Sequence, residues 1–552
     1  MKNKDKNKPQ IHSTLKEDGT TFIDKLNDSL QKKETLIFCF ILGLAILFSW
    51  KIFDPRISLS GDDSSYVMRA NEFLKNHTFP SYQGPFFPMV LALMIKLKGV
   101  IDIQLLKMVS FVSFITSIPF FFFALKGKLK PMILLPFIAL YAFNSLELIY
   151  SSYLLSESFY LLLESICFFI LFKFCLSDNN KPWIHFLIPC ILLGVFIYTL
   201  GITRNIGIIS FPLVIAPMLL FKHYKAALIT VIGFLLMFGA FYVYKSQFAA
   251  PPQLDSQLKI LLNKNAYSDA DGKEDLAGFF GRVVDNSNQY LSKHMLSSMG
   301  LRKAPTDTDA PLSNSPIATI FMYALMLFGL YIAYRKKDLI IIINYLFAFA
   351  LSLATFLILQ AFWDQDRLIL IFSPFWIIGL LYALYQLSTT FLKGIGSSLY
   401  IILFSLSLIT TTVKSVGLFD EKSSIMSDFN NGDKYAGFDP NWQNYLAMCE
   451  WCSKNISTKE KILVRKQEMG YVVSDGYLFA GVYKSPDKNQ TADSILNSYK
   501  RDHIRYVLQD HIFGTVTNYL SVINNAYPAM LKEKKRIGTT PDTDAVLYEL
   551  QY

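Results

Sequence analysis

The sequence predicts an all-α polytopic membrane bundle followed by a small soluble α/β domain at the C-terminus. Of its 552 residues, 52% are hydrophobic and only 17% are charged, which is more apolar side chain than a soluble core can bury. Apolar runs of about 20 residues, enough to cross about 30 Å of hydrocarbon, recur from Leu36 to Val413. After Val413 the pattern changes to short helices and strands, which predicts a separate soluble domain.

Residues 1–35 are polar and mixed in charge, and we predict a cytosolic tail there. They contain no short apolar stretch followed by a small-residue cleavage site, so we expect the first apolar run to remain as an uncleaved span.

About eleven spans are predicted within a transmembrane domain of residues 36–413. They lie near 36–53, 104–125, 131–150, 154–176, 184–203, 205–222, 226–244, 314–334, 339–361, 367–388 and 396–413. The stretch from Pro85 to Ile103 is also apolar, but Lys96, Lys98 and Asp102 interrupt it. We therefore predict an amphipathic helix at the membrane interface there.

The basic residues predict the orientation. With the Lys32-Lys33 end inside, the short basic loops all fall on the inner side; they contain Lys126, Lys128, Lys130, Lys222, Lys225, Arg335, Lys336, Lys337 and Lys393. The net charge of +10 is spread over these loops rather than over one basic face, so no nucleic-acid partner is expected. Three polar segments then lie outside: residues 54–103, 245–313 and 414–552.

The segment 414–552 predicts an extracytoplasmic α/β domain. A helical period covers 442–456, and strands are expected at 461–465, 470–473, 504–509 and 545–550. Cys449 and Cys452 form a C-x-x-C there, which fits a local disulfide, two idle thiols, a redox pair or half of a metal site.

Two adjacent carboxylates, Asp62 and Asp63, follow the first span in the sequence Gly61-Asp62-Asp63-Ser64-Ser65-Tyr66. Either could cap the N-terminus of a helix running through Ala70 to Lys75. Alternatively, carboxylates this close to a membrane surface could take part in catalysis.

Further segments predicted on the outer side carry polar residues in a defined order. They are Gly84-Pro85-Phe86-Phe87-Pro88, Leu154-Leu155-Ser156-Glu157-Ser158, Gly201-Ile202-Thr203-Arg204-Asn205-Ile206-Gly207, and Trp363-Asp364-Gln365-Asp366-Arg367-Leu368 with Ser373-Pro374. An ionisable residue at a membrane boundary is costly unless it is paired or lies in a polar cavity. Structural ion pairs or snorkelling ends are the alternative interpretation.

In order and position these motifs resemble the GT-C glycosyltransferases, especially protein O-mannosyltransferases and lipid A aminoarabinose transferases, over most of the chain. Three departures are visible: Asp63 replaces the usual Glu of the acid pair, no His precedes the prolines at Pro85, and Arg204 stands where aminoarabinose transferases have Lys.

The resemblance implies an inverting transfer of a single sugar from a polyprenyl-phosphate donor to an acceptor hydroxyl at the outer face. A carboxylate must then accept the hydroxyl proton; Asp62 is the first candidate and Asp63 the second. Arg204 and Arg367 are the candidates for binding the donor phosphate. Tyr66, Glu157 and Asp366 are candidate contacts for the acceptor or the sugar.

The expected partners are a lipid-linked sugar donor, a glycan, lipid or protein acceptor, and membrane lipids. The resemblance implies no metal, although paired acids are also what a divalent cation prefers. The expected location is a bacterial inner membrane with a cytoplasmic N-terminus. Two alternatives stay open: a glycan ligase or oligosaccharyltransferase-like enzyme, and a transporter without covalent chemistry.

Overall fold

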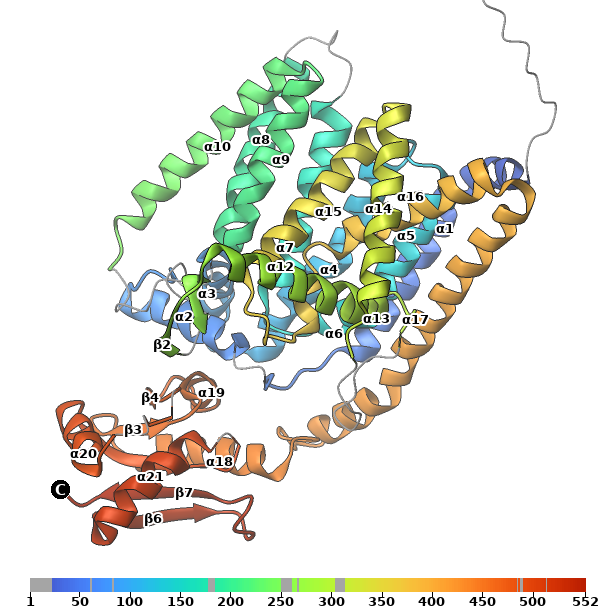
Figure 1. The fold of residues 1–552 in the computed structure, drawn as a ribbon. Helices are drawn as coiled ribbons and strands as arrows, with labels where there is room; N and C mark the ends of the chain where they lie inside the picture. The colour runs from blue at the N-terminus through green and yellow to red at the C-terminus, as the bar shows by residue number, and fades with distance from the viewer. Residues whose placement is uncertain are drawn as a thin grey trace, which may run out of the picture.

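The computed structural model describes residues 22–59, 62–81, 84–176, 184–249, 261–265, 268–302, 313–483, 485–486, 490–512 and 514–552. Over these residues the chain forms a tall helical bundle with a smaller α/β domain beneath one end (Figure 1). We call that end of the bundle the domain-facing end.

The bundle contains these helices and short helical turns: α1 (Phe22–Ile52), α4 (Ile103–Leu125), α5 (Pro131–Ala142), α6 (Ser145–Tyr150), α7 (Ser156–Ile170), η1 (Leu171–Cys175), α8 (Ile184–Thr203), η2 (Asn205–Ile209), α9 (Ser210–Leu220), α10 (Tyr224–Lys245), α14 (Pro316–Lys336), α15 (Leu339–Ile358), η4 (Asp366–Ile369), α16 (Ser373–Gln386), η5 (Leu387–Phe391) and α17 (Lys393–Asn430). Among the described residues, eight helices are long and apolar enough to cross a membrane: α1, α4, α7 with η1, α8, α10, α14, α15 and α17. The chain is therefore a multi-pass membrane protein.

Three of the predicted spans are shorter helices. The span predicted at 131–150 is divided into α5, which has 12 residues, and α6, because Asn144 caps a new helix there. The spans at 205–222 and 367–388 correspond to η2 with α9 and to η4 with α16. Every residue of α5 and nearly every residue of α16 is buried, so protein rather than lipid surrounds them. Apolar runs in the sequence do not separate such inner helices from spans.

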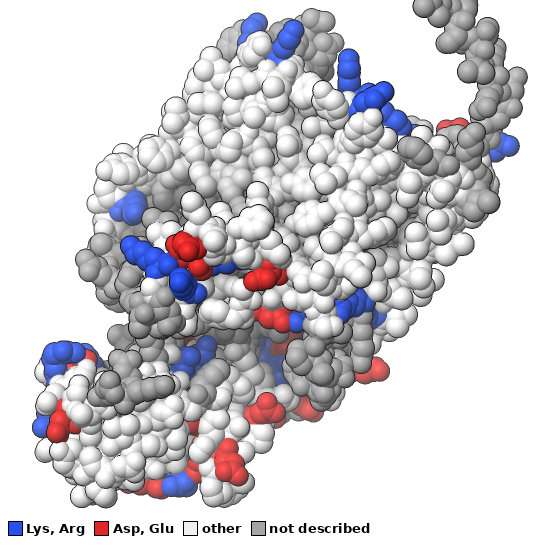
Figure 2. All heavy atoms as spheres, viewed as in Figure 1, with Lys and Arg blue, Asp and Glu red and all other residues white. Residues whose placement is uncertain are grey.

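The end opposite the C-terminal domain is basic. Figure 2 shows a nearly uncharged surface over the middle of the bundle and Lys and Arg side chains at that opposite end. Lys126 donates to Thr35 on α1, and Lys130 donates to Tyr385 at 3.1 Å. Lys336 donates to Gln386 on α16 at 2.6 Å. The predicted basic loops thus meet at one end; the Lys393 side chain lies outside the described residues, as do residues 1–21 of the predicted tail, whereas 22–35 belong to α1.

The domain-facing end carries the polar segments predicted outside. Between α1 and α4 lie α2 (Asp62–Asn76) and α3 (Phe86–Lys98); between α10 and α14 lie β1 (Asn263–Asn265), β2 (Ser268–Lys273), α12 (Leu276–Gln289), η3 (Tyr290–Met295) and α13 (Leu296–Ser298). The helix predicted at the interface is α3, which buries Phe87, Leu91 and Ile95 and exposes Leu93 and Leu97. Parts of the predicted loop 245–313, namely 250–260, 266–267 and 303–312, lie outside the described residues.

The C-terminal domain follows α17, a single helix of 38 residues that continues through the predicted boundary at residue 414. Its elements are α18 (Pro440–Asn455), β3 (Lys461–Val464), α19 (Gln467–Val473), β4 (Ala480–Gly481), α20 (Ala492–Arg501), β5 (Ile504–Gln509), α21 (Thr515–Ala526), η6 (Pro528–Met530), β6 (Leu531–Ile537) and β7 (Ala545–Leu550). The sheet order is β4-β3-β5-β7-β6, with β3 parallel to β4 and β5, and β7 antiparallel to β5 and β6.

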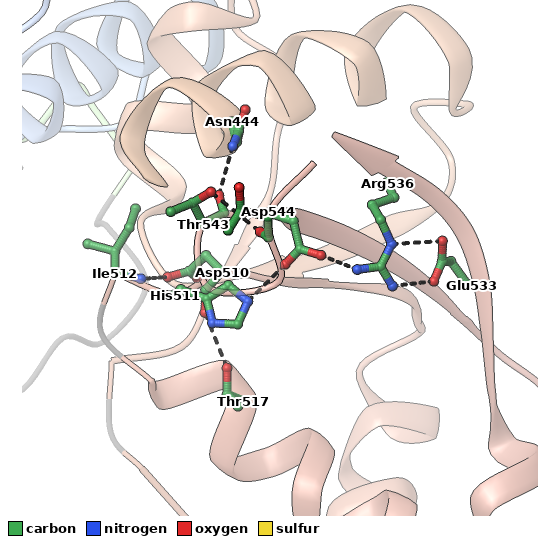
Figure 3. A network of polar contacts seen from close by, with 10 residues as sticks. Asn444, Asp510, His511, Ile512, Thr517, Glu533, Arg536, Thr543 and Asp544 are labelled. Carbon is green, nitrogen blue, oxygen red and sulfur yellow. Dashed lines mark hydrogen bonds and ion pairs between the residues drawn. The ribbon is translucent and has the colours of Figure 1, made fainter. Parts of the chain in front are cut away.

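Period-two alternation places helices on both faces of this sheet. In β5, Tyr506 and Leu508 pack with α18, whereas Val507, on the other face, packs with α20 and α21. The strand predicted at 470–473 is wrong: these residues belong to α19, where Met469 to Val472 are buried. Strands β4 and β6 were not predicted. Figure 3 shows Asp544, at the start of β7, accepting from His511 at 2.9 Å and from Arg536, which also pairs with Glu533; this network ties the ends of β5, β6 and β7 together.

Cys449 and Cys452 are free thiols in the core between α18 and the sheet. Burial raises the pKa of Cys449 well above its ordinary value and that of Cys452 to about 12. Both thiols therefore stay protonated and act as small buried side chains.

The C-terminal domain docks on the bundle through two segments. Asn71 of α2 donates to the Tyr471 hydroxyl of α19 at 2.6 Å, and Tyr471 and Val472 join the apolar cluster of α2 and α3. Arg56, which pairs with Asp54 at 2.6 Å, lies 4.5 Å from the Phe438 ring centroid and donates to the Ala436 carbonyl. These contacts hold the chain on either side of Asp62.

Candidate functional site

The acid pair begins α2, and its two carboxylates have different environments. Asp63 is 1% exposed, and its Oδ2 accepts the Leu154 N–H at 2.9 Å, which joins α2 to the start of α7. Asp62 is half-buried, and its Oδ2 lies 2.5 Å from Nη2 of Arg367. Asp63 is therefore tied into the fold, whereas Asp62 retains an accessible carboxylate.

Arg367 reaches Asp62 from η4, the turn that precedes α16. Gln365 accepts from Nε of Arg367 at 3.0 Å, and Pro374 near the start of α16 favours the first turn of that helix. Asp366, on the same turn, accepts the Tyr150 hydroxyl at 2.7 Å. The late motif thus presents Asp366 and Arg367 side by side at the domain-facing end.

Glu157 and Arg204 form a second ion pair in this region. The Glu157 carboxylate, in the first turn of α7, lies 2.7 Å from Nη1 of Arg204, which also donates to Ser156 at 3.2 Å. Arg204 directly follows α8, in a tight turn where a side chain on Gly207 would place its Cβ 2.4 Å from the Leu200 carbonyl oxygen. The glycine is required there, and the turn directs Arg204 toward α7.

Tyr66 links the two ion pairs. Its hydroxyl lies 3.1 Å from Oγ of Ser156, and its ring stands edge-on to Phe87. Electrostatic interactions connect Arg367 with Asp62, Glu157 and Tyr66, and Arg204 with Arg367. The structure therefore brings Asp62, Tyr66, Glu157, Arg204, Asp366 and Arg367 into one cluster, with Asp63 behind it.

A cavity of about 520 Å³ opens beside this cluster. Its lining is Leu59, Leu146, Tyr150, Tyr153, Leu155, Lys293, His294, Ser297, Asp364, Gln365, Asp366 and Arg367. The volume is that of a small-molecule site, and the lining combines five leucine and tyrosine residues with seven polar or charged ones. Of the predicted residues, Asp366 and Arg367 line the cavity directly.

Sequence reasoning missed a polar triad in the lining. Asp364 accepts from His294 Nε2 at 2.5 Å and from Lys293 Nζ, and both donors lie on the π-helical turn η3. Lys293 and His294 are buried, at 4% and 3% exposure. Asp364 stood in the motif next to Asp366, but the Lys293-His294 pair lies about 70 residues away and is not part of any motif we recognised. A π-helical turn is itself frequent at functional sites.

The charges of the triad follow from its surroundings. Burial raises the pKa of Asp364, but hydrogen bonds from Lys293 and His294 outweigh burial and hold that pKa below its ordinary value. Burial lowers the pKa of His294, opposed by Asp364, so the ring is neutral at pH 7. Because a carboxylate only accepts, Nε2 of the neutral ring carries the hydrogen and Nδ1 is left as an acceptor.

Two supporting groups come from outside the predicted set. Burial raises the pKa of Asp54, but Arg56, Lys107 and Lys422 outweigh it and keep the pKa well below its ordinary value. Lys466, which directly precedes α19, interacts electrostatically with Asp62; burial and Arg465 nevertheless lower its pKa. The C-terminal domain therefore contributes a cation near the acid pair.

No group of three or more His, Cys, Asp or Glu side chains suited to a metal ion occurs within the described ranges. Asp62 and Asp63 are engaged by Arg367 and by a backbone amide, respectively.

The protein resembles known proteins in its three-dimensional structure. No family model and no curated protein matches the sequence. The archaeal oligosaccharyltransferase AglB from Archaeoglobus fulgidus, in complex with an inhibitory peptide and a dolichol-phosphate, superposes with a TM-score of 0.54 at 10% identity, covering 94% of this chain and 75% of that one. The same enzyme tethered to an acceptor peptide gives 0.52 at 11% identity, covering 95% and 75%.

ArnT from Cupriavidus metallidurans, bound to undecaprenyl phosphate, gives a TM-score of 0.49 at 9% identity, covering 92% of this chain and 97% of that one. At such identities the comparisons establish the fold alone: the chain has the fold of the archaeal oligosaccharyltransferase, a helical membrane bundle with a small C-terminal α/β domain, which is the fold class that its sequence predicts.

Proposed function

We propose that this protein is a membrane glycosyltransferase that moves a single sugar from a polyprenyl-phosphate donor to an acceptor hydroxyl. The observation that carries the proposal is the Asp62–Arg367 pair at 2.5 Å, which stands beside a 520 Å³ cavity at the domain-facing end of a GT-C fold. The dolichol-phosphate in the similar archaeal structure supports a lipid-linked donor.

Asp62 is the proposed general base. As the acceptor oxygen bonds to the anomeric carbon, its proton passes to the Asp62 carboxylate. The bond from that carbon to the phosphate oxygen breaks on the opposite side, with inversion, and its electron pair stays on the phosphate. Asp63 is the weaker candidate because it is buried and already accepts the Leu154 N–H.

Arg367 is the proposed partner of the leaving phosphate. It lines the cavity, and a guanidinium binds phosphate oxygens through paired N–H groups. Arg204 is held by Glu157 and Ser156 and lies outside the cavity lining. Its proposed role is therefore to stabilise the negative charge of the phosphate electrostatically, without direct contact. Tyr66, Glu157 and Asp366 position the cluster.

We propose that no divalent cation is needed, because Arg367 already neutralises Asp62 and Asp63 already accepts an amide. We also propose a bacterial inner membrane location, with the basic end of the bundle in the cytoplasm and the C-terminal domain outside. The gathering of basic loops at one end supports this orientation. Labelling of single cysteines placed at Lys225 and Asn455 in intact cells tests it.

The test of the activity is transfer of label from radiolabelled polyprenyl-phosphate hexoses by the purified protein in native lipids. We expect label to move to an acceptor of the native membrane, unchanged by EDTA, and at a lower rate in Arg367→Met. Donors ignored by every preparation would overturn the proposal.

A second candidate is transfer of a preassembled glycan, because the two similar structures described above with TM-scores of 0.54 and 0.52 are of an oligosaccharyltransferase. Turnover of oligosaccharide-lipid donors without turnover of single-sugar donors would favour this candidate.

A further inference from the structure

The cavity lining contains two kinds of side chain. Tyr150 and Tyr153, whose ring centroids lie 5.3 Å apart, and three leucines are its aromatic and aliphatic part. The polar and charged side chains from η3, Ser297 and the segment 364–367 are its other part. A pyranose also has both an apolar C–H face and a rim of hydroxyl groups. The mixed lining therefore suits a sugar ring better than a wholly apolar or wholly charged ligand.

The charges in the lining balance. Lys293 and Arg367 are the two cations of the lining, and Asp364 and Asp366 are its two anions. Lys293 pairs with Asp364 inside the lining, whereas Arg367 pairs with Asp62 at the edge of the cavity and is the proposed partner of the donor phosphate. A charge on the sugar itself would compete with the Lys293–Asp364 pair, whereas a neutral sugar leaves that pair intact.

One acceptor in this lining is left without a partner among the described residues. Nδ1 of His294 is buried and receives no hydrogen bond there. The groups that face the ring are Asp364 at Nε2, the charges of Asp366 and Lys293, and the Tyr290 ring with its centroid 5.5 Å away. An orphan acceptor on a residue that lines a cavity is costly until a ligand donates to it.

From these three features we infer that the cavity receives the transferred sugar, that this sugar is a neutral hydroxylated ring, and that one of its hydroxyl groups donates to Nδ1 of His294. His294 is then a specificity-determining residue, and Asp364 is a positioning residue that fixes the ring and its tautomer. The inference rests on the proposed function and adds the class of sugar: a neutral hexose rather than an amino sugar or a uronic acid.

The first experiment needs only the wild-type protein. Polyprenyl-phosphate donors carrying mannose, glucose or galactose are compared with donors carrying aminoarabinose, which is cationic, or glucuronic acid, which is anionic. We expect at least one neutral donor to exceed both charged donors about tenfold or more in kcat/KM. A charged donor that matches or exceeds every neutral one overturns the inference.

The second experiment compares His294→Leu with a series of monodeoxy donors. We expect His294→Leu to lower kcat/KM for the parent sugar about 10- to 100-fold, and to have no effect on the one deoxy donor that lacks the bonded hydroxyl. His294→Gln, whose amide oxygen can accept, should recover part of the loss. His223→Leu, at the start of α10 and far from the cavity, is the matched control.

Equal loss on the parent and on every deoxy donor would show that His294 only supports the fold, and would overturn the inference while the proposed function stands. If the wild type turns over no lipid-linked sugar of any charge, the proposed function fails and the inference fails with it.

Discussion

Removal of the guanidinium of Arg204 should destabilise the protein strongly, because it would leave the Glu157 carboxylate buried without its partner. That side chain is only 3% exposed and lies 2.7 Å from Nη1 of Arg204. Breaking a buried pair by removing one partner costs about 3–5 kcal/mol. We therefore expect Arg204→Met to lower the free energy of unfolding by about that amount.

The reverse change should cost less. In Glu157→Gln the remaining Arg204 side chain is 20% exposed and can turn toward water, so we expect a loss of about 1.5–3 kcal/mol, the worth of a hydrogen bond to a charged group. The double variant removes both charges, so it should be more stable than the sum of the single losses predicts.

The assay is equilibrium unfolding in mixed micelles for the wild type, both single variants and the double variant. A coupling free energy of about 1.5 kcal/mol or more is expected. Losses that add to within about 0.5 kcal/mol would refute the ion pair as a structural element and would leave Arg204 free for donor binding alone.

Three further predictions follow from local geometry. Gly233→Ala should separate α8 from α10, because its Cβ would lie 2.3 Å from the Ile191 carbonyl oxygen; thermal unfolding should show a large loss, whereas Gly239→Ala, with no atom within 4 Å, should show none. Tyr471→Phe removes the 2.6 Å hydrogen bond to α2 and should cost about 1 kcal/mol, seen as faster hydrogen exchange in α19. Because the pKa of His294 is lowered on folding, the unfolded chain protonates first as pH falls through about 6.5, so the wild type should lose stability between pH 7 and pH 5 and His294→Gln should lose less, as measured by thermal unfolding.

Much of the architecture was predictable because membrane spans and amphipathic strands have short-range periods. The helices α1, α4, α8 and α10 and the strands β5 and β7 lie where the apolar patterns place them. The division of residues 131–150 into α5 and α6 was not predicted, because its local signal, the Asn144 cap, lies inside a long apolar run. The apolar pattern of residues 470–473 fits a strand as well as a helix. Only the packing of this segment against α2 favours the helix α19.

The site was predictable where a motif carried its residues and not elsewhere. Asp62 and Arg367 were chosen on separate motifs 305 residues apart, and the structure pairs them, although their roles stay a prediction. The unequal burial of Asp62 and Asp63 could not be predicted from the sequence, because it depends on the Leu154 amide, which lies just before α7. Lys293 and His294 were missed for the same reason: only the folded loop brings them to Asp364.

The measurement that tests the central claim most directly is the turnover of a polyprenyl-phosphate hexose by Asp62→Asn, with donor binding measured on the same preparation. Asp420→Asn, at an exposed position on α17, is the matched control, and Asp63→Asn reports the effect of losing the buried carboxylate. The account predicts that Asp62→Asn binds the donor normally but transfers about 10²–10⁴-fold more slowly, whereas Asp420→Asn resembles the wild type. Transfer by Asp62→Asn at the wild-type rate would contradict it.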